Sequence, residues 1–457
     1  MGSDYILAWA AWMMSFAAWL AMAGLTVRLR SGALFATVIA VFVSMIARPP
    51  IVLFGLSSPI PSAWFAGQEP GTFALGSAVS CIWILVLTLS FAFWTSAGVP
   101  GKGLFPRGSR ALRPGVLLFW GGALIAVSAG ITFYLVAVSG GFAAFQFAVK
   151  VSKDFAGAYM LRHIGTLGLL LVMIALISFA RPRGTGRAQG RAQGRRPGRR
   201  PGRRPGGLFW LSAAALLLGL ATNFLWGNRY NIALILIGLA FSWHYHVRRL
   251  SPVRAAVLGL CSVAALQGLR MLRTALFSEN VGRDLSGGMP FWQEISLSLH
   301  FQEFDAMLLA IRDAGSLFDF RHGADFLNGL LSWVPRALFP SKETFHIGGW
   351  LRQVYEPHTI NGWPPALPGA WYINFGSLGI ILGAILSGFL LAVFDAHYRD
   401  KSSPWNTVMG VMLPLLIAGG GISMGLPQQI FMTVLPLWVL CLLAHGTPRL
   451  QATPGTA

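Results

Sequence analysis

Long apolar runs alternate with short polar or basic connections along most of the chain. A bilayer core about 30 Å thick needs roughly 20 consecutive apolar residues in a helix. By this rule the pattern predicts eleven membrane-spanning helices, at about residues 5–25, 33–56, 72–97, 115–138, 163–180, 208–226, 230–246, 253–275, 369–394, 405–425 and 430–444. The first run follows Asp4 and lacks a basic flank, which is typical of an anchor rather than a cleaved signal peptide. We therefore expect an all-α, multi-pass membrane protein.

The composition agrees with this class, and the charges predict an orientation. The chain of 457 residues is 55% hydrophobic and 11% charged, with a mean hydropathy of +0.61. Alternate connections hold 22 of the 35 basic residues and 2 of the 15 acidic ones. Because basic loops stay in the cytoplasm, the N-terminus is expected outside and the C-terminus inside. The high net charge thus reflects topology and does not indicate a nucleic-acid partner.

The connections divide the chain into five parts. Residues 181–207 form an Arg/Gly/Pro-rich segment of low complexity that cannot build a packed core, so it is predicted to be a disordered cytoplasmic linker, with contact to anionic lipid or nucleic acid as the other interpretation. The other parts are an N-terminal membrane bundle, central spans, a large external loop with short helices, and C-terminal spans, at residues 1–180, 208–275, 276–368 and 369–457.

The external loop contains an amphipathic helical pattern. Apolar residues recur at helical spacing at Leu297, Phe301, Phe304, Leu308 and Ile311. On a helical projection Asp305 falls along the flank of this stripe, which predicts that it borders a cleft at the margin of the helix. Asp305 is the first candidate for a general base, with Glu294, Glu303 and His358 as alternatives. An equally open interpretation pairs Asp305 structurally with a loop arginine such as Arg312.

Several arginines lie inside or beside the apolar spans, where charge is costly and often functional. Arg48 comes before Pro49 and Pro50, which free backbone carbonyls that protein or water must satisfy. Other arginines lie at the expected outer face, at Arg229, Arg270 and Arg273. Each of these side chains can also extend to the lipid headgroups without a further role.

The stretch WVPRALFPSK, residues 333–342, places Arg336 and Lys342 around Pro335 and Pro340 in the external loop. Arginine offers a planar fork of donors that suits phosphate oxygens, and lysine offers a compact charge. Together with Arg352, these residues are candidates for binding a phosphorylated ligand at the membrane surface. Anchoring of the loop to lipid headgroups is the other interpretation.

Motifs of other chemistries are not found. The histidines of the external loop have no HxxxH or HExxH spacing, and the chain has no DxD, Walker or GxSxG motif and no CxxC pair. The expected first external loop contains Glu69 as its one acid. We therefore expect neither a metal site nor a bound cofactor, and neither a metal-dependent transferase nor an ATP-driven pump.

Four segments carry a resemblance to a known family. They are GNRYN at 227–231, FQEFDAMLLAI at 301–311, WVPRALFPSK, and LPGAWYINFGSLGIILGAILSGFLL at 367–391. They resemble the oligosaccharide repeat unit polymerases, or Wzy-type O-antigen polymerases, over about residues 222–394. The matching positions include Pro335, Arg336, Tyr372 and Asn374. Phe339 and Glu343 stand where the family often has tryptophan and proline.

The resemblance implies a metal-independent glycosyltransferase at the outer face of the bacterial cytoplasmic membrane. Its partners would be polyprenyl diphosphate-linked oligosaccharides as donor and acceptor, membrane lipids and a protein that regulates chain length. A hydroxyl of the acceptor attacks the anomeric carbon of the donor, and polyprenyl diphosphate leaves. On this basis Asp305, Arg336 and Arg229 are expected to be catalytic, and Arg48, Arg270, Arg273, Lys342 and Arg352 to bind the diphosphate.

Two other functions stay open from the sequence. An O-antigen ligase-like transferase would share the donor and an external loop but use another acceptor. A transporter of lipid-linked saccharides or anions would be expected to line a path with charge through several spans and to show related halves. In this sequence the charges concentrate at the outer ends, and no internal repeat is visible.

Overall fold

A computed structural model describes the chain over residues 3–29, 31–54, 70–98, 113–149, 159–180, 206–226, 229–249, 303–331, 347–357, 362–399 and 430–444, and at a few positions between them. Over this part the regular elements are helices, and one isolated β-bridge pairs Ala314 with Phe318. Seven of the helices are long and apolar enough to cross a membrane. The protein is thus a helical, multi-pass membrane protein.

Nine of the eleven expected spans are helical in the part of the chain that the structure describes. Seven correspond to long helices: α1 (Ser3–Leu29), Gly32–Leu53, α4 (Pro70–Ser96), α5 (Pro114–Val138), α7 (Tyr159–Ala180), α8 (Gly207–Leu225) and α15 (Leu367–Arg399). Two more are helical but shorter in apolar length: α9 (Arg229–His246), and η5 (Ile430–Val434) with α18 (Leu435–Leu443). The run at 253–275 is described at a few positions only, and the run at 405–425 lies outside the described residues.

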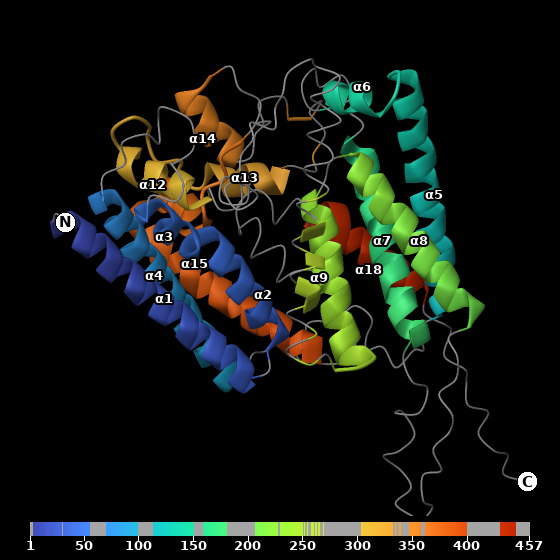
Figure 1. Ribbon diagram of the computed structural model, residues 1–457, viewed down its shortest axis with the longest axis horizontal. Helices are drawn as coiled ribbons and strands as arrows, with labels where there is room; N and C mark the ends of the chain where they lie inside the picture. Colours follow the sequence, from blue (N-terminus) through green and yellow to red (C-terminus); the bar gives the residue numbers. More distant parts are fainter. Residues whose placement is uncertain are drawn as a thin grey trace, which may run out of the picture. The chain divides into compact units, whose positions relative to one another are not determined.

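The chain divides into two compact units. Unit 1 contains α1, the segment Gly32–Leu53, α4, α15 and three short helices from residues 276–368, the segment predicted to be an external loop. The short helices are α12 (Glu303–Asp313), α13 (Ala324–Leu330) and α14 (Ile347–Tyr355), and they gather at one end of the long ones (Figure 1). The predicted external loop thus has a folded helical layer in its described part.

The long helices of unit 1 approach closely at small and hydroxylated residues. Ser15 of α1 donates to the carbonyl of Ser77 in α4. Ser90 of α4 donates to the carbonyl of Ile385 in α15 at 2.8 Å. A Cβ on Gly388 would lie 2.6 Å from the carbonyl oxygen of Leu87. Small residues at such crossings let backbones meet where no hydrophobic force drives helices together.

Helix α15 contains a break within its apolar run. Gly376 has φ 62° and ψ −153°, which is not helical. The turn brings Trp371 back onto the following segment, where a Cβ on Gly383 would lie 2.4 Å from the Trp371 ring and one on Gly379 would lie 2.4 Å from the Trp371 carbonyl oxygen. The glycine-rich sequence of this span is therefore required to pack a large ring beside the break.

Unit 2 is a bundle of α5, α6 (Phe142–Phe147), α7, α8, α9 and α18. Helices α5 and α7 approach each other closely, since a Cβ on Gly168 would lie 2.8 Å from the carbonyl oxygen of Gly121. Gly140 and Gly141, with φ 83° and 118°, turn the chain from the end of α5 into α6. Helix α6 then packs Phe145 against Trp226 at the end of α8.

Candidate functional site

Arg48 lies where the second span changes its helical pitch. The span runs as α2 (Gly32–Val41), the π-helix η1 (Phe42–Ile46) and α3 (Arg48–Leu53). In the π turn the amide of Ala47 donates to the carbonyl of Phe42, five residues earlier, at 2.9 Å. Single π turns are frequent at functional sites because the extra residue re-aims the side chains that follow.

The two prolines after Arg48 explain part of this geometry. Pro50 has no N–H to donate to the carbonyl of Ile46, four residues earlier. That carbonyl accepts a hydrogen bond of 2.9 Å from the indole Nε1 of Trp12 in α1. The sequence predicted that the prolines free backbone carbonyls. In the structure Trp12 of the neighbouring helix satisfies the carbonyl of Ile46.

Arg48 is fully buried and paired with Asp305 of α12. The Nη2 atom of Arg48 lies 2.9 Å from Oδ2 of Asp305, and Nε lies 3.1 Å from the same oxygen and 3.4 Å from Oδ1. The exposed fractions of the two side chains are 0% and 2%. The pair therefore joins the second span to α12 inside a protein environment that excludes solvent.

The apolar stripe predicted that Asp305 lies at the margin of its helix, but the structure buries it. Packing around α12 explains the difference. On one side Phe304 and Leu308 face Gly76 of α4, where an added Cβ would lie 2.1 Å from Leu308 Cδ2. On another side Met307 faces Gly369 at the start of α15. Neighbouring helices therefore cover the polar flank of α12 as well as its apolar stripe, and Asp305 lies on that flank.

The pairing also settles the partner of Asp305 in this structure. Arg312, the partner considered from the sequence, bonds Asp313 instead, with Nε 2.6 Å from Oδ1. Burial raises the pKa of Asp305 above the ordinary range of an aspartate, and the nearby Arg48 guanidinium acts in the opposite direction. A carboxylate in such a site is a strong base whenever its cation moves away.

A second polar cluster lies beside the break in α15. Asp325 of α13 accepts hydrogen bonds from Nε of Arg321 at 3.0 Å and from Nδ2 of Asn374 at 2.8 Å. The amide of Arg321 donates to the carbonyl of Ile373 at 2.9 Å, just before the break. The guanidinium of Arg321 stacks on Trp350, 4.5 Å from the ring centre. This cluster fixes α13 and α14 to the motif segment of α15.

The sequence analysis missed Arg321 and Asp325. Their spacing of four residues is the signal that could have indicated a pair on one helical turn. It did find Asn374, which the structure buries in this cluster, and Tyr372, whose ring contacts Phe320 edge to face at 5.8 Å.

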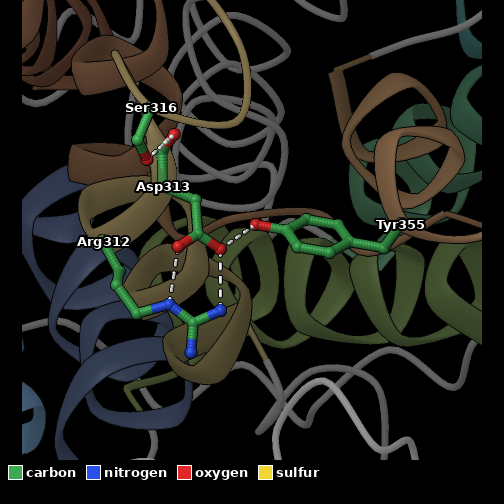
Figure 2. A network of polar contacts seen from close by, with 4 residues as sticks. All are labelled: Arg312, Asp313, Ser316 and Tyr355. Atoms are coloured by element: carbon green, nitrogen blue, oxygen red, sulfur yellow. Dashed lines mark hydrogen bonds and ion pairs between the residues drawn. The ribbon is translucent and has the colours of Figure 1, made fainter.

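A third network holds α14 against α12, as Figure 2 shows. Asp313 accepts from Nε and Nη2 of Arg312 and, at 2.5 Å, from the hydroxyl of Tyr355. Ser316 donates to the backbone carbonyl of Asp313 at 3.0 Å. Burial, followed by the contact with Asp313, raises the pKa of Tyr355. The network therefore links the C-terminal end of α12 to the C-terminal end of α14.

The remaining site candidates differ in what the structure describes. Arg352, expected to bind diphosphate, bonds Glu356 at 2.7 Å and lies over the ring of Trp363. Glu303 begins α12, and its backbone carbonyl accepts from the amide of Ala366. The backbone of Arg229 begins α9 in unit 2, but its side chain lies outside the described part. The other candidates lie wholly outside the described part: Arg270, Arg273, Glu294, Arg336, Lys342 and His358.

Within the described residues, no group of three or more His, Cys, Asp or Glu side chains is arranged to hold a metal ion. Comparison of the chain with protein-family models, with curated proteins and with solved structures finds no match.

Proposed function

We propose that the protein is a glycosyltransferase that polymerises polyprenyl diphosphate-linked oligosaccharide repeat units into a surface polysaccharide. The site would lie at the outer face of a bacterial cytoplasmic membrane, with the N-terminus outside and the C-terminus inside. The observation that supports the proposal is the buried Arg48–Asp305 pair, which joins a proline-interrupted span to the short helix α12. Buried charges of this kind are functional candidates by default in a membrane protein.

The chemistry of this transfer fits an arginine and a carboxylate. The acceptor hydroxyl forms a bond to the anomeric carbon, and the bond from that carbon to the diphosphate oxygen breaks. The leaving diphosphate takes the electron pair, and its developing charge is stabilised by guanidinium groups in a site that excludes water. The proton of the hydroxyl passes to a base. A diphosphate is already a good leaving group, so positioning and charge stabilisation are the main tasks of the protein.

We assign linked roles to the two residues of the pair. The Nε and Nη2 atoms of Arg48 both bond Asp305, and a fork of this kind binds phosphate oxygens equally well. Because both side chains are enclosed, the donor diphosphate would bind Arg48 by taking the place of Asp305. The carboxylate, released in a desolvated site, would then accept the proton of the attacking hydroxyl.

The first test is polymerisation by the purified protein. The protein is incubated with a polyprenyl diphosphate-linked repeat unit in the presence of a chelator, and the products are separated on a gel. We expect a ladder from the native protein. Arg48→Lys, which keeps the charge but loses the fork, should lower the rate a hundredfold or more, as should Asp305→Asn. Arg312→Lys alters an exposed ion pair and serves as the matched control that keeps the ladder.

Other outcomes separate the alternatives. Transfer of one saccharide chain to lipid A-core without a ladder would indicate a ligase. Movement of a labelled lipid-linked saccharide across proteoliposomes without glycosidic bond formation would indicate a transporter. A native ladder that Arg48→Lys and Asp305→Asn both retain would leave the polymerase intact and remove the pair from its mechanism.

A further inference from the structure

A layer of buried polar side chains lies in unit 2, and the proposed transfer makes no use of it. It consists of Ser128 and Thr132 of α5, Gln146 of α6 and Asn223 of α8, each at most 2% exposed. The described residues of unit 2 include no aspartate or glutamate. The layer is therefore neutral and rich in oxygen atoms.

The donor groups of this layer have partners. Nε2 of Gln146 donates to the carbonyl of Leu225, and Nδ2 of Asn223 donates to the carbonyl of Gly219 at 3.1 Å. The hydroxyl of Thr132 donates to the carbonyl of Ser128 at 2.6 Å and accepts from Nε1 of Trp226 at 2.9 Å. These contacts fix the orientation of both carboxamides.

Among the described residues, no group donates a hydrogen bond to either of the two carboxamide oxygens. They are Oε1 of Gln146 and Oδ1 of Asn223, and both are buried. Exchanging the oxygen and nitrogen of either carboxamide would not satisfy these groups. Each amide nitrogen faces a carbonyl oxygen, and a second oxygen in its place would be repelled. A buried polar atom without a partner calls for an explanation, and a bound water molecule or ion is one.

Helix geometry places these groups in one layer. Gly219 of α8 faces α7 and α5, since an added Cβ would lie 2.6 Å from Leu169 Cδ2 and 3.1 Å from Ile125 Cδ1. Asn223 lies one turn further along the same face. One turn along α7 and α5 in the same direction, a Cβ on Gly165 would lie 2.6 Å from Ser128 Oγ. Gln146 reaches the same end of α8 through its bond to Leu225.

We propose that this layer binds a monovalent cation, Na⁺ or K⁺, with the carboxamide oxygens of Gln146 and Asn223 as ligands. Cations of this class are bound in membrane proteins by neutral carbonyl-type oxygens. Mg²⁺ and Ca²⁺ sites depend on carboxylates, which the described part of unit 2 lacks. A water molecule would donate to both oxygens, but its own lone pairs need donors, and the donors named above are already used.

The bound ion would stabilise the corner where α6 meets α8. Helix α6 is attached there by the Gln146 bond and by the Phe145–Trp226 ring contact of 5.2 Å. An ion shared by Gln146 and Asn223 would add a direct link between the two helices. Because it binds the folded state, its effect on thermal stability should saturate with concentration.

The test uses the purified full-length protein in nanodiscs. Thermal unfolding is followed by tryptophan fluorescence while Na⁺ or K⁺ replaces N-methyl-D-glucamine at constant ionic strength, and binding of radiolabelled Na⁺ is measured in parallel. We expect a saturable rise in Tm and saturable binding of about one ion per chain. Mg²⁺ at the same ionic strength should produce neither.

Variants locate the site. Asn223→Leu and Gln146→Leu remove the oxygens but keep side-chain volume, so they should abolish Na⁺ binding and make Tm independent of Na⁺, whatever their Tm in its absence. Asn328→Leu changes a carboxamide of α13 in unit 1 and should leave both responses unchanged. The proposal is overturned if the native protein shows no saturable response, which would mean ordered water only, or if both leucine variants still bind Na⁺. Neither readout depends on transferase activity.

Discussion

The indole N–H of Trp12 bonds the carbonyl of Ile46, the group that Pro50 leaves without its helical donor. A second tryptophan of α1 makes a similar contact with a different consequence. Nε1 of Trp19 donates to the carbonyl of Val38 at 2.8 Å, but that carbonyl also accepts from the amide of Phe42. The two bonds look alike, yet the Val38 carbonyl has a backbone donor as well.

This difference predicts unequal effects of two matched substitutions. Trp12→Phe should destabilise the protein by about 1–3 kcal/mol, because it leaves a buried carbonyl without a donor. Trp19→Phe should cost about 1 kcal/mol or less, since the amide of Phe42 still serves Val38. Denaturation in detergent, followed by circular dichroism, measures both. Equal losses would show that ring packing, not the hydrogen bond, determines the effect.

The Arg48–Asp305 pair predicts a separation of stability from activity. Arg48→Ala should destabilise the fold by about 3–5 kcal/mol, because it leaves a carboxylate buried without its cation. Replacing both residues, as Arg48→Met with Asp305→Leu, should restore much of the stability, since apolar side chains suit the enclosed site. The double variant should still produce no ladder. If it polymerises repeat units, the pair has only a structural role.

The break in α15 predicts intolerance of small additions. Gly383→Ala should destabilise the protein, because its Cβ would overlap the Trp371 ring, with ring atoms 2.4–2.6 Å away. Gly122→Ala in α5 is the control, because no atom lies within 4 Å of its added Cβ, and it should be neutral or stabilising by about 0.5–1 kcal/mol. Thermal unfolding of the two variants gives the comparison. A harmless Gly383→Ala would mean that the Trp371 ring moves aside freely.

The network of Figure 2 predicts a dependence on alkaline pH. The pKa of Tyr355 is raised by burial and by Asp313, so the folded state holds this proton more tightly than the unfolded state. The resulting stability is present below about pH 10, the ordinary pKa of tyrosine, and is lost as pH rises above it. Tyr355→Phe should lose about 1 kcal/mol at neutral pH through the missing hydrogen bond.

The measurement is chemical denaturation of both proteins between pH 8 and pH 11. The native curve should fall more steeply than that of Tyr355→Phe above about pH 10. Parallel curves would contradict a perturbed Tyr355 and leave only the hydrogen bond.

Local patterns predicted much of the fold because bilayer thickness fixes the length of a span. The ends of the long helices differ from the predicted ends by a few residues, as at Pro70–Ser96 against 72–97 and Pro114–Val138 against 115–138. The break at Gly376 was not predicted, because a single glycine in an apolar run does not report its backbone angles. The structure shows the break in the backbone angles of Gly376 and in the close approach of Gly379 and Gly383 to Trp371.

The candidate site was predicted residue by residue but not as pairs. Arg48 and Asp305 were each singled out, one by its prolines and the other by a helical stripe, yet their 257-residue separation gave no reason to join them. Arg321 and Asp325 were missed because local charge spacing is common on exposed helices. Burial and long-range pairing depend on which helices meet, and hydropathy alone does not contain that information.

The segment from Ser31 to Leu53 is anchored at both ends. At its start Ser31 donates to Asp395 of α15 at 2.8 Å, and at its far end Arg48 is held by Asp305. Between the anchors lies a π turn with one surplus residue. Tightening that turn to an α-helix would rotate everything beyond it by roughly 100° about the axis. The guanidinium of Arg48 would then point away from its carboxylate while Ser31 stayed fixed, so the one surplus residue of this turn sets the direction of a buried charge.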